Sequence, residues 1–203
     1  MPPKVSEEYR QSTRDKILEA AESVFQRKGY HDTSMDNVVA ESGLSKGAIY
    51  GYFKSKEELF ENLKNRGFEI NLDRARAILE SNESARSKLE KVADIYFLSQ
   101  NEVSREACRM SLQFSAASLQ MKPVHQHLEE RYQEIHSLLA ILLKEGVRRG
   151  EFRKGIDVDS IASLLIATVD GLTLRWATLD AEINWRKIKD ALTDLVFDGV
   201  SSR

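Results

Sequence analysis

Apolar residues recur every three or four positions through most of the chain, which is the spacing of one face of an α-helix. The first such stripe lies between Ser12 and Gly29 and consists of Ile17, Leu18, Ala21, Val24 and Phe25. It predicts an amphipathic helix that ends at Gly29, with Ser6 as an alternative, earlier start. The same spacing predicts further helices over residues 56–79, 85–100, 105–119, 123–149, 156–179 and 184–200.

Three hydroxyl residues are each followed, three positions later, by an acid, which is the spacing of a capping box at a helix start. The pairs are Ser12 with Asp15, Thr33 with Asp36, and Ser55 with Glu58. Between the last two pairs, the pattern predicts two short helices over residues 34–41 and 45–53. Gly43 lies between these helices and suits the left-handed conformation that closes a helix and begins a tight turn.

Two helical segments near the end of the chain are unusually apolar. Residues 156–179 contain only Asp157, Asp159, Asp170 and Arg175 as charges, so this helix must be covered on more than one side. In residues 184–200, apolar or small residues alternate at steps of three and four, which is the seam of one helix packed on another. The seam residues are Trp185, Ile188, Leu192, Leu195 and Gly199.

Composition agrees with an all-helical fold. Of the 203 residues, 41% are hydrophobic and 31% are charged, and Pro123 is the single proline between Lys4 and Arg203. So few helix breakers argue against an all-β fold. The one cysteine forms no internal disulfide and no apolar leader follows Met1, which predicts a cytoplasmic protein without a membrane segment. The net charge of −2, taken alone, argues against a nucleic-acid binder.

The two short helices joined by a glycine turn have the outline of a helix-turn-helix, whose second helix enters the DNA major groove. Projection of residues 45–54 at 100° per residue places Ile49 and Phe53 on one face. The opposite face carries Gly47, Ala48, Tyr50, Gly51 and Lys54. Each glycine costs a helix about 1 kcal/mol relative to alanine. Close approach to another surface would explain both glycines, and relief of crowding within the helix is the alternative.

The residues in and around this motif resemble the DNA-binding domain of TetR-family transcriptional regulators. The resemblance rests on residues 13–21 (TRDKILEAA), Phe25, Gly29-Tyr30, residues 33–35 (TSM), residues 43–53 (GLSKGAIYGYF) and residues 55–59 (SKEEL). Tyr52 departs from the pattern because the family often has histidine there. A second local similarity, to the carboxy-terminal region of many members, covers residues 148–153 (RRGEFR) and 170–172 (DGL).

The resemblance implies an all-α homodimer in which each subunit has two domains. An amino-terminal three-helix helix-turn-helix domain, here residues 1–56, would bind DNA. A carboxy-terminal helical domain, residues 57–203, would bind an effector and form the dimer. The implied function is that of a ligand-responsive regulator, expected to be a repressor, which a small lipophilic effector releases from a near-palindromic double-stranded DNA operator. No catalytic residue, cofactor or metal is expected.

Carried over position by position, the resemblance implies DNA contacts by residues of the two short helices and the start of the next one. These residues are Thr33, Ser34, Ser45, Lys46, Gly47, Ala48, Tyr50, Tyr52 and Lys56. Lys46 can donate to guanine acceptors, and the Ala48 methyl group can contact a thymine methyl group. Hydroxyls and free helix N–H groups suit phosphate oxygens. The alternatives place Tyr52 partly in the core and make Lys54 and Lys56 merely solvated charges.

The two apolar carboxy-terminal helices are expected to form a four-helix interface between subunits. The interface residues would be Ile161, Leu165, Leu172, Trp185, Ile188, Leu192 and Leu195. Burial within one subunit is the alternative on periodicity alone. The resemblance favours the interface, because these regulators dimerise through their last two long helices.

An effector pocket is expected among the middle helices, as an apolar cavity with a few polar groups. The candidate lining residues are Tyr96, Phe97, Met110, Phe114, Met121 and Trp176. Ordinary core packing is the favoured alternative for each of them. His125 and His127 lie two positions apart and so point to different helix faces, which favours solvated or capping histidines over metal ligands. Cys108 is expected to be a buried, inert thiol, with a redox sensor as the alternative.

The charge total becomes informative when the chain is divided. Residues 1–56 hold nine Lys or Arg and eight Asp or Glu, whereas residues 57–203 hold 21 and 24. The acidity of the body therefore masks a nearly neutral amino-terminal part. Two rival functions are a small helical enzyme, for which four histidines and one cysteine offer no recognised arrangement, and an architectural DNA-binding protein without an effector.

Overall fold

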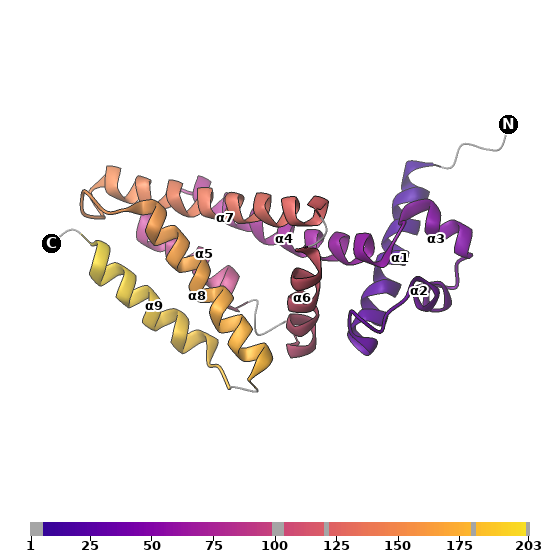
Figure 1. Cartoon of the computed structure of the whole chain (residues 1–203). Helices are drawn as coiled ribbons and strands as arrows, with labels where there is room; N and C mark the ends of the chain where they lie inside the picture. The colour runs from indigo at the N-terminus through magenta and orange to yellow at the C-terminus, as the bar shows by residue number, and fades with distance from the viewer. Residues whose placement is uncertain (1–5, 99–103, 120–121, 180–181, 202–203) are drawn as a thin grey trace. The chain divides into compact units, whose positions relative to one another are not determined.

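The computed structural model describes residues 6–98, 104–119, 122–179 and 182–201, and over these residues the backbone forms nine helices and no strand (Figure 1). The helices are α1 (Glu7–Lys28), α2 (Met35–Ser42), α3 (Lys46–Tyr52), α4 (Lys56–Glu80), α5 (Ala85–Leu98), α6 (Arg105–Ser118), α7 (Lys122–Arg149), α8 (Val158–Thr178) and α9 (Trp185–Val200). The predicted all-α fold is therefore confirmed.

The chain divides into two compact units. The amino-terminal unit consists of the chain up to Phe68 together with Met110–Ala117, and the carboxy-terminal unit consists of Glu69–Arg109 and Ser118–Arg203. Both α4 and α6 therefore contribute residues to each unit. The compact units are defined by packing, so the functional boundary expected after residue 56 remains a prediction.

In the amino-terminal unit, α1 supplies most of the core. Its stripe from Ile17 to Phe25 is buried as predicted, and α2 packs against this helix. The Phe25 ring lies edge-on to Phe60, with centroids 5.0 Å apart, and Phe60 in turn contacts Tyr30 at 5.2 Å and Phe114 at 4.8 Å. These four rings connect α1, α4, α6 and the loop after α1. Tilted and edge-to-face aromatic pairs add to the stability that their burial provides.

The first predicted capping box is wrong. Ser6 is the N-cap of α1, and its hydroxyl accepts a hydrogen bond from the Tyr9 N–H at 3.2 Å. Ser12 consequently lies inside the helix, where Asp15 accepts a hydrogen bond from the Gln11 side chain. Nothing between Ser6 and Ser12 interrupts the helical pattern, and two glutamates in the first turn favour the earlier start.

The second predicted box is displaced by one residue, and the third is confirmed in its hydroxyl half. Ser34 caps α2 by accepting from the Asn37 N–H, while the Asn37 side chain accepts from the Ser34 N–H. Asparagine thus takes the place expected for Asp36. At the start of α4, the Ser55 hydroxyl accepts from the Glu58 N–H at 3.2 Å, and Glu58 accepts from the N–H of Lys54 at 2.7 Å.

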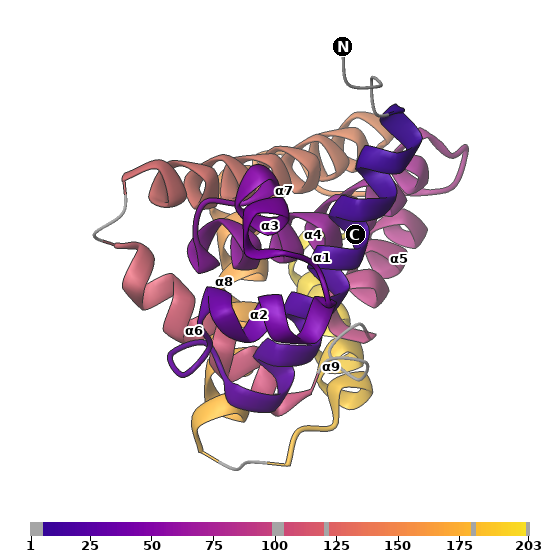
Figure 2. The same ribbon diagram turned by 90° about the vertical axis from the view of Figure 1, so that its right-hand side faces the viewer.

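In the carboxy-terminal unit, α5 packs against both α7 and α9, and α8 packs against α7. Figures 1 and 2 show α7 as the long helix of this unit, with the orange α8 and the yellow α9 following it in the chain. The turn after α7 contains Gly150, which has a φ of 75°. It leads to Phe152, whose side chain is buried and whose backbone pairs with Ser201 in an isolated bridge.

Helix α8 is long and apolar but little covered within one subunit. An 18-residue window has a mean hydropathy of 1.2, and 11% of it is buried. Length and composition alone would allow this one helix, among the described residues, to cross a membrane. A helix that packs inside a globular protein can have the same length and composition. Leu164 and Leu174 on α8 are 67% and 48% exposed, and Leu195 on α9 is 72% exposed. The described residues of this chain therefore do not provide the predicted covering of α8 on several sides.

Candidate nucleic-acid interface and apolar cavity

Helices α2 and α3 form the predicted helix-turn-helix. Gly43 ends α2 in the left-handed conformation, with a φ of 67°, and Ser45 begins α3 by accepting a hydrogen bond from the Ala48 N–H. Ile49 and Phe53 are buried, as the helical projection predicts. The opposite face of α3 is consequently held toward solvent by the packing of these two side chains.

The glycines of α3 leave open space on that solvent face. A Cβ atom placed on Gly47 or Gly51 would meet nothing within 4 Å outside its own helix. Crowding within the unit therefore does not require glycine at either position. A flat backbone surface instead permits close approach by another molecule, while Tyr50 and Tyr52 are half-buried beside it.

Lys46, in the first turn of α3, is held by an acid of α2. Its Nζ lies 2.7 Å from Oδ1 of Asp36 and 5.9 Å from the centroid of the Tyr50 ring. The hydrogen bond to Asp36 and the charge of that carboxylate raise the pKa of Lys46. Both side chains of this pair are largely exposed. A cation is thus placed at the start of the exposed helix, with a neighbouring anion that competes for it.

Lys56 organises the loop before α2. Its Nζ donates to the backbone carbonyls of Tyr30 at 3.0 Å, His31 at 3.0 Å and Thr33 at 3.1 Å. An ammonium group has three N–H donors, so all three have partners within the unit. The Thr33 side chain is buried, and its hydroxyl donates to the Gly29 carbonyl at 2.7 Å.

The predicted DNA-contacting residues therefore fall into two groups in the structure. One group lies along the accessible surface of α3 and the start of α2: Ser34, Ser45, Lys46, Gly47, Ala48, Tyr50 and Tyr52. Thr33 and Lys56 form the other, and their polar atoms bind the protein's own backbone. Sequence reasoning missed the pairing of Lys46 with Asp36, because Asp36 was assigned to a capping box.

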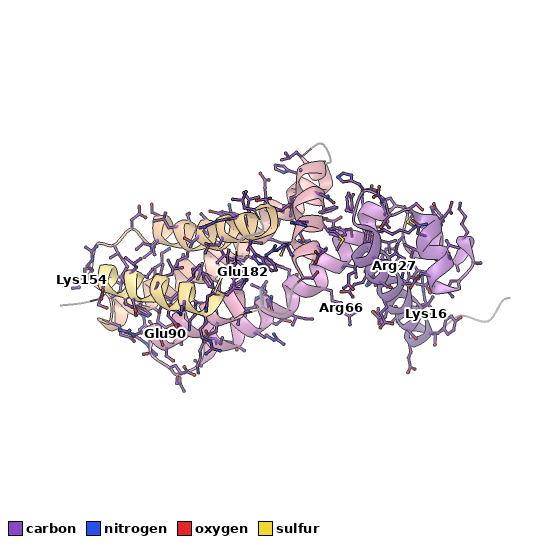
Figure 3. All side chains as sticks on the ribbon, turned by 90° about the horizontal axis from the view of Figure 1, so that it is seen from below. Lys16, Arg27, Arg66, Glu90, Lys154 and Glu182 are labelled. Atoms are coloured by element: carbon purple, nitrogen blue, oxygen red, sulfur yellow. The ribbon has the colours of Figure 1, made fainter. Side chains whose placement is uncertain are left out.

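Two arginines of this unit, Arg27 and Arg14, are held by other side chains. Arg27 binds Glu41 at 2.7 Å, which lowers the pKa of Glu41 through this hydrogen bond. Arg14 donates to Asn62 and lies 5.4 Å from the centroid of the Phe53 ring. Figure 3 shows the side chains, with Lys16 and Arg27 of α1 labelled. The charge of Arg27 is thus paired with an acid, in agreement with the nearly neutral total of this part of the chain.

The carboxy-terminal unit contains an apolar cavity of about 100 Å³ lined by α5, α7, α8 and α9. Tyr96 and Phe97 line it, as predicted for the effector pocket. The remaining lining is Leu89, Val92, Ala93, Ile135, Leu139, Leu165, Ile166, Val169, Asp170, Leu192, Thr193 and Val196. Sequence reasoning missed Asp170 as a lining residue, although it is one of very few charges in α8.

The other predicted effector-binding residues do not line this cavity. Met110 and Phe114 belong to the core of the amino-terminal unit. Trp176 lies edge-on to Trp185 at 5.9 Å, with the Arg105 guanidinium 5.4 Å from its ring centroid. Met121 lies outside the described residues.

The predicted interface residues are distributed over several environments. Trp185 is buried, whereas Ile161, Leu172 and Ile188 are half-buried and Leu195 is exposed. Leu165 and Leu192 line the cavity. The exposed Leu164 and Leu174 were not predicted. A helix that is apolar nearly all round gives no periodic signal that separates its cavity side from its outer side.

The residues considered for metal or redox chemistry show no such arrangement. Among the described residues, no group of three or more His, Cys, Asp or Glu side chains could hold a metal ion. His125 lies 3.5 Å from Glu129, one turn along α7. Cys108 is buried, as expected for a structural thiol.

A helix-turn-helix unit followed by a helical body with an internal cavity defines the class of ligand-binding transcriptional regulators. Residues 17–63 match the family model described as bacterial regulatory proteins, tetR family, and residues 85–198 match that of the BetI-type transcriptional repressor, C-terminal. The chain belongs to the TetR family of transcriptional regulators.

Similar proteins support this assignment along nearly the whole chain. An uncharacterized HTH-type transcriptional regulator of Bacillus subtilis, YfiR, is 30% identical over 182 residues, which are 90% of this chain and 88% of that protein. A putative regulator from Saccharomonospora viridis, solved with choline, has a TM-score of 0.80 at 23% identity and covers 95% of this chain and 100% of its own. FadR from Bacillus subtilis, solved with stearoyl-CoA, has a TM-score of 0.72 at 22% identity, covering 91% and 98%. These two likenesses show the fold, and the relatives are regulators rather than enzymes.

Proposed function

We propose that this protein is a transcriptional repressor that binds a near-palindromic operator as a homodimer and is released by a small lipophilic effector. The observation that carries the proposal is the exposed face of α3, where Gly47 and Gly51 leave the backbone open and Ser45 caps the helix. Residues 1–56 would act as the DNA-binding domain and residues 57–203 as the effector-binding and dimerisation domain. The protein would act in the cytoplasm, where it would bind its operator.

DNA recognition would depend on the first turn of α3. Lys46 would donate to guanine, and the Ala48 methyl group would contact a thymine methyl group in the major groove. Ser34, Ser45, Tyr50 and Tyr52 would donate to phosphates or sugars. Thr33 and Lys56 would act indirectly, by fixing the loop that leads into α2, since their polar groups already have backbone partners.

The exposed apolar surface of α8 and α9 supports a dimer. Leu164, Leu174 and Leu195 project from one subunit into solvent, and exposed apolar patches of this kind mark protein interfaces. A second copy related by twofold symmetry would cover this surface. The two α3 helices would then enter successive major grooves about 34 Å apart, which requires a near-palindromic site.

The cavity supports a response to a small molecule. A ligand that fills it would favour the conformations in which it fits best, and operator affinity would fall if those conformations bind DNA less well. One structural neighbour was solved with choline and another with stearoyl-CoA. Because these ligands differ greatly in size and charge, the fold alone does not select an effector for this chain.

Selection of binding sites from random DNA duplexes tests the proposal directly. The purified protein is expected to enrich a near-palindrome, because two symmetry-related α3 helices would read equivalent half-sites. Affinity for the selected duplex should fall about a hundredfold or more between 50 and 200 mM salt, since phosphate contacts release counterions. Enrichment of no sequence, or an affinity independent of salt, would refute DNA recognition of this kind.

Replacing Asp36 with asparagine is expected to strengthen operator binding about threefold to tenfold at low salt. The change removes a negative charge near the phosphates and frees Lys46 from its 2.7 Å ion pair. The gain should shrink above physiological salt, where exposed charges are screened. Fluorescence anisotropy with the selected duplex measures the effect. Asp73→Asn removes the same charge from α4 and serves as the control, so an equal gain in both variants would contradict the role given to Lys46.

A further inference from the structure

The cavity of the carboxy-terminal unit has one charged residue in an otherwise uncharged lining. Thirteen of its lining residues are aliphatic, aromatic or hydroxyl side chains, and the remaining one is Asp170. The hydroxyl of Thr193 donates to the Lys189 carbonyl of its own helix at 2.7 Å. The carboxylate is therefore the feature of this cavity that selects most strongly among ligands by charge.

Asp170 is placed at the cavity by the register of α8. Ile166 and Asp170 are four residues apart and so lie on one helix face, together with Val169, and all three line the cavity. The acid at position 159 lies in the first turn of α8, where the helix dipole favours a negative charge. Asp170 lies near the middle of α8, where the helix dipole does not stabilise a negative charge.

No described residue pairs with the carboxylate of Asp170. It forms no hydrogen bond or ion pair with any residue that the structure describes. Asp170 is an exposed residue at the edge of the cavity, and partial desolvation by the atoms around it raises the pKa of its carboxyl group. A cation bound in the cavity is attracted to this carboxylate, and the attraction is stronger beside apolar surface than in bulk water because the local dielectric constant is lower.

Two aromatic rings stand in the same lining. Tyr96 and Phe97 come from α5, which lines the cavity together with α8. The face of an aromatic ring carries partial negative charge and attracts a cation within about 6 Å. The rings and the carboxylate therefore favour the same sign of charge in the ligand.

We propose that the effector is a small lipophilic cation, an amine or a quaternary ammonium compound, whose charge pairs with Asp170 and whose apolar part contacts Tyr96 and Phe97. This inference rests on the proposed function, since it names the ligand class of the same cavity. An anionic ligand would bring a second negative charge to Asp170. An uncharged ligand would gain nothing from the charge of Asp170.

The size of the cavity limits the apolar part. Its volume is about 100 Å³, and an engineered cavity of about 150 Å³ in another protein holds benzene. A single ring or a short branched chain is thus the scale of group that enters without displacing helices. Asp170 also retains exposed surface, so the charged group pairs with it at the edge of the cavity while the apolar part lies inside.

Three probes of one size distinguish the ligand classes: benzyltrimethylammonium, its uncharged carbon isostere neopentylbenzene, and the anion phenylacetate. Binding to the full-length protein is followed by the fluorescence of Trp176 and Trp185, which both lie in the carboxy-terminal unit. The cation is expected to bind at least about tenfold more tightly than its isostere, a difference of about 1.4 kcal/mol. Phenylacetate is expected to bind most weakly.

Asp170→Asn keeps the shape of the side chain and should abolish the preference for the cation without weakening neopentylbenzene. Asp194→Asn on α9, an exposed acid outside the lining, should leave both affinities unchanged. Equal binding of the cation and its isostere, tighter binding of phenylacetate, binding of none of the probes, or unchanged cation affinity in Asp170→Asn would each overturn the inference. Operator selection without any probe tests the proposed function separately, so the two can fail independently.

Discussion

Replacing Gly146 with alanine is expected to lower the free energy of unfolding by about 3 kcal/mol, because an added methyl group would be forced into a filled part of the core. A Cβ atom at this position would lie 2.2 Å from Cδ2 and 2.3 Å from Cε2 of Phe152. The Phe152 ring cannot easily withdraw. It is 2% exposed, its N–H donates to the Gly146 carbonyl at 3.1 Å, and the next residue donates to the Val200 carbonyl at 2.7 Å. Urea denaturation followed by circular dichroism measures the loss.

A second glycine provides the matched control. Gly67 lies exposed within α4, where an added Cβ would meet nothing within 4 Å. Gly67→Ala should therefore stabilise the protein by up to about 1 kcal/mol through helix propensity alone. Combining Gly146→Ala with Phe152→Ala should show strong non-additivity, because the second change removes the clash. A Gly146→Ala variant as stable as the wild type would mean that Phe152 is not packed on α7 in this way.

Local sequence patterns were sufficient for the helices but not for this contact. Helical spacing predicted α7 and a loop around Gly150, yet nothing in that spacing brings Phe152 back onto Gly146. The same limit applies to helix starts. Thr33 and Ser34 are adjacent hydroxyls, and the choice of Ser34 as the cap depends on Asn37 and on the burial of Thr33, which belong to the folded loop.

The candidate DNA-binding surface could be predicted only in part for a similar reason. The projection of α3 correctly separated the buried Ile49 and Phe53 from the exposed face. The partners of Lys46 and Lys56, however, depend on how α3 crosses α2 and how the chain turns after α1. Those are tertiary features, so sequence reasoning expected DNA contacts from both lysines. In the structure, Lys46 is an accessible cation. The three N–H donors of Lys56 instead bind three backbone carbonyls.

The cavity could not be located from sequence because a void has no residue pattern of its own. Leu165 and Leu192 were assigned to a subunit interface because their helices are apolar and the family resemblance favours dimerisation through them, and both line the cavity. Of the candidate effector-pocket residues, Tyr96 and Phe97 line the cavity, whereas Phe114 has the same aromatic character and fills the core of the other unit. Asp170 is the useful exception, because an acid in the middle of an apolar helix is visible in the sequence and its position calls for a partner.

Replacing Lys88 with methionine is expected to destabilise the carboxy-terminal unit by about 2–3 kcal/mol. Lys88 is 2% exposed, and its Nζ donates to the Leu79 carbonyl at 2.8 Å and to both carboxylate oxygens of Glu145 at 3.1 Å. Methionine preserves most of the packing of the lysine stem but leaves the carbonyl and the carboxylate short of a donor. The loss stays below that of a fully isolated charge because Arg149 still pairs with Glu145 at 3.1 Å.

Lys91→Met separates this effect from the general removal of a lysine. Lys91 lies one turn further along α5 and pairs with Glu83, but its side chain is half exposed. Water and salt screen such a pair, so its loss should cost no more than about 1 kcal/mol. In Lys88→Met, adding Glu145→Gln should recover part of the lost stability. The uncharged glutamine amide would replace a carboxylate whose charge Arg149 alone compensates. Equal losses in Lys88→Met and Lys91→Met would show that burial of the Lys88 pair contributes nothing to its strength.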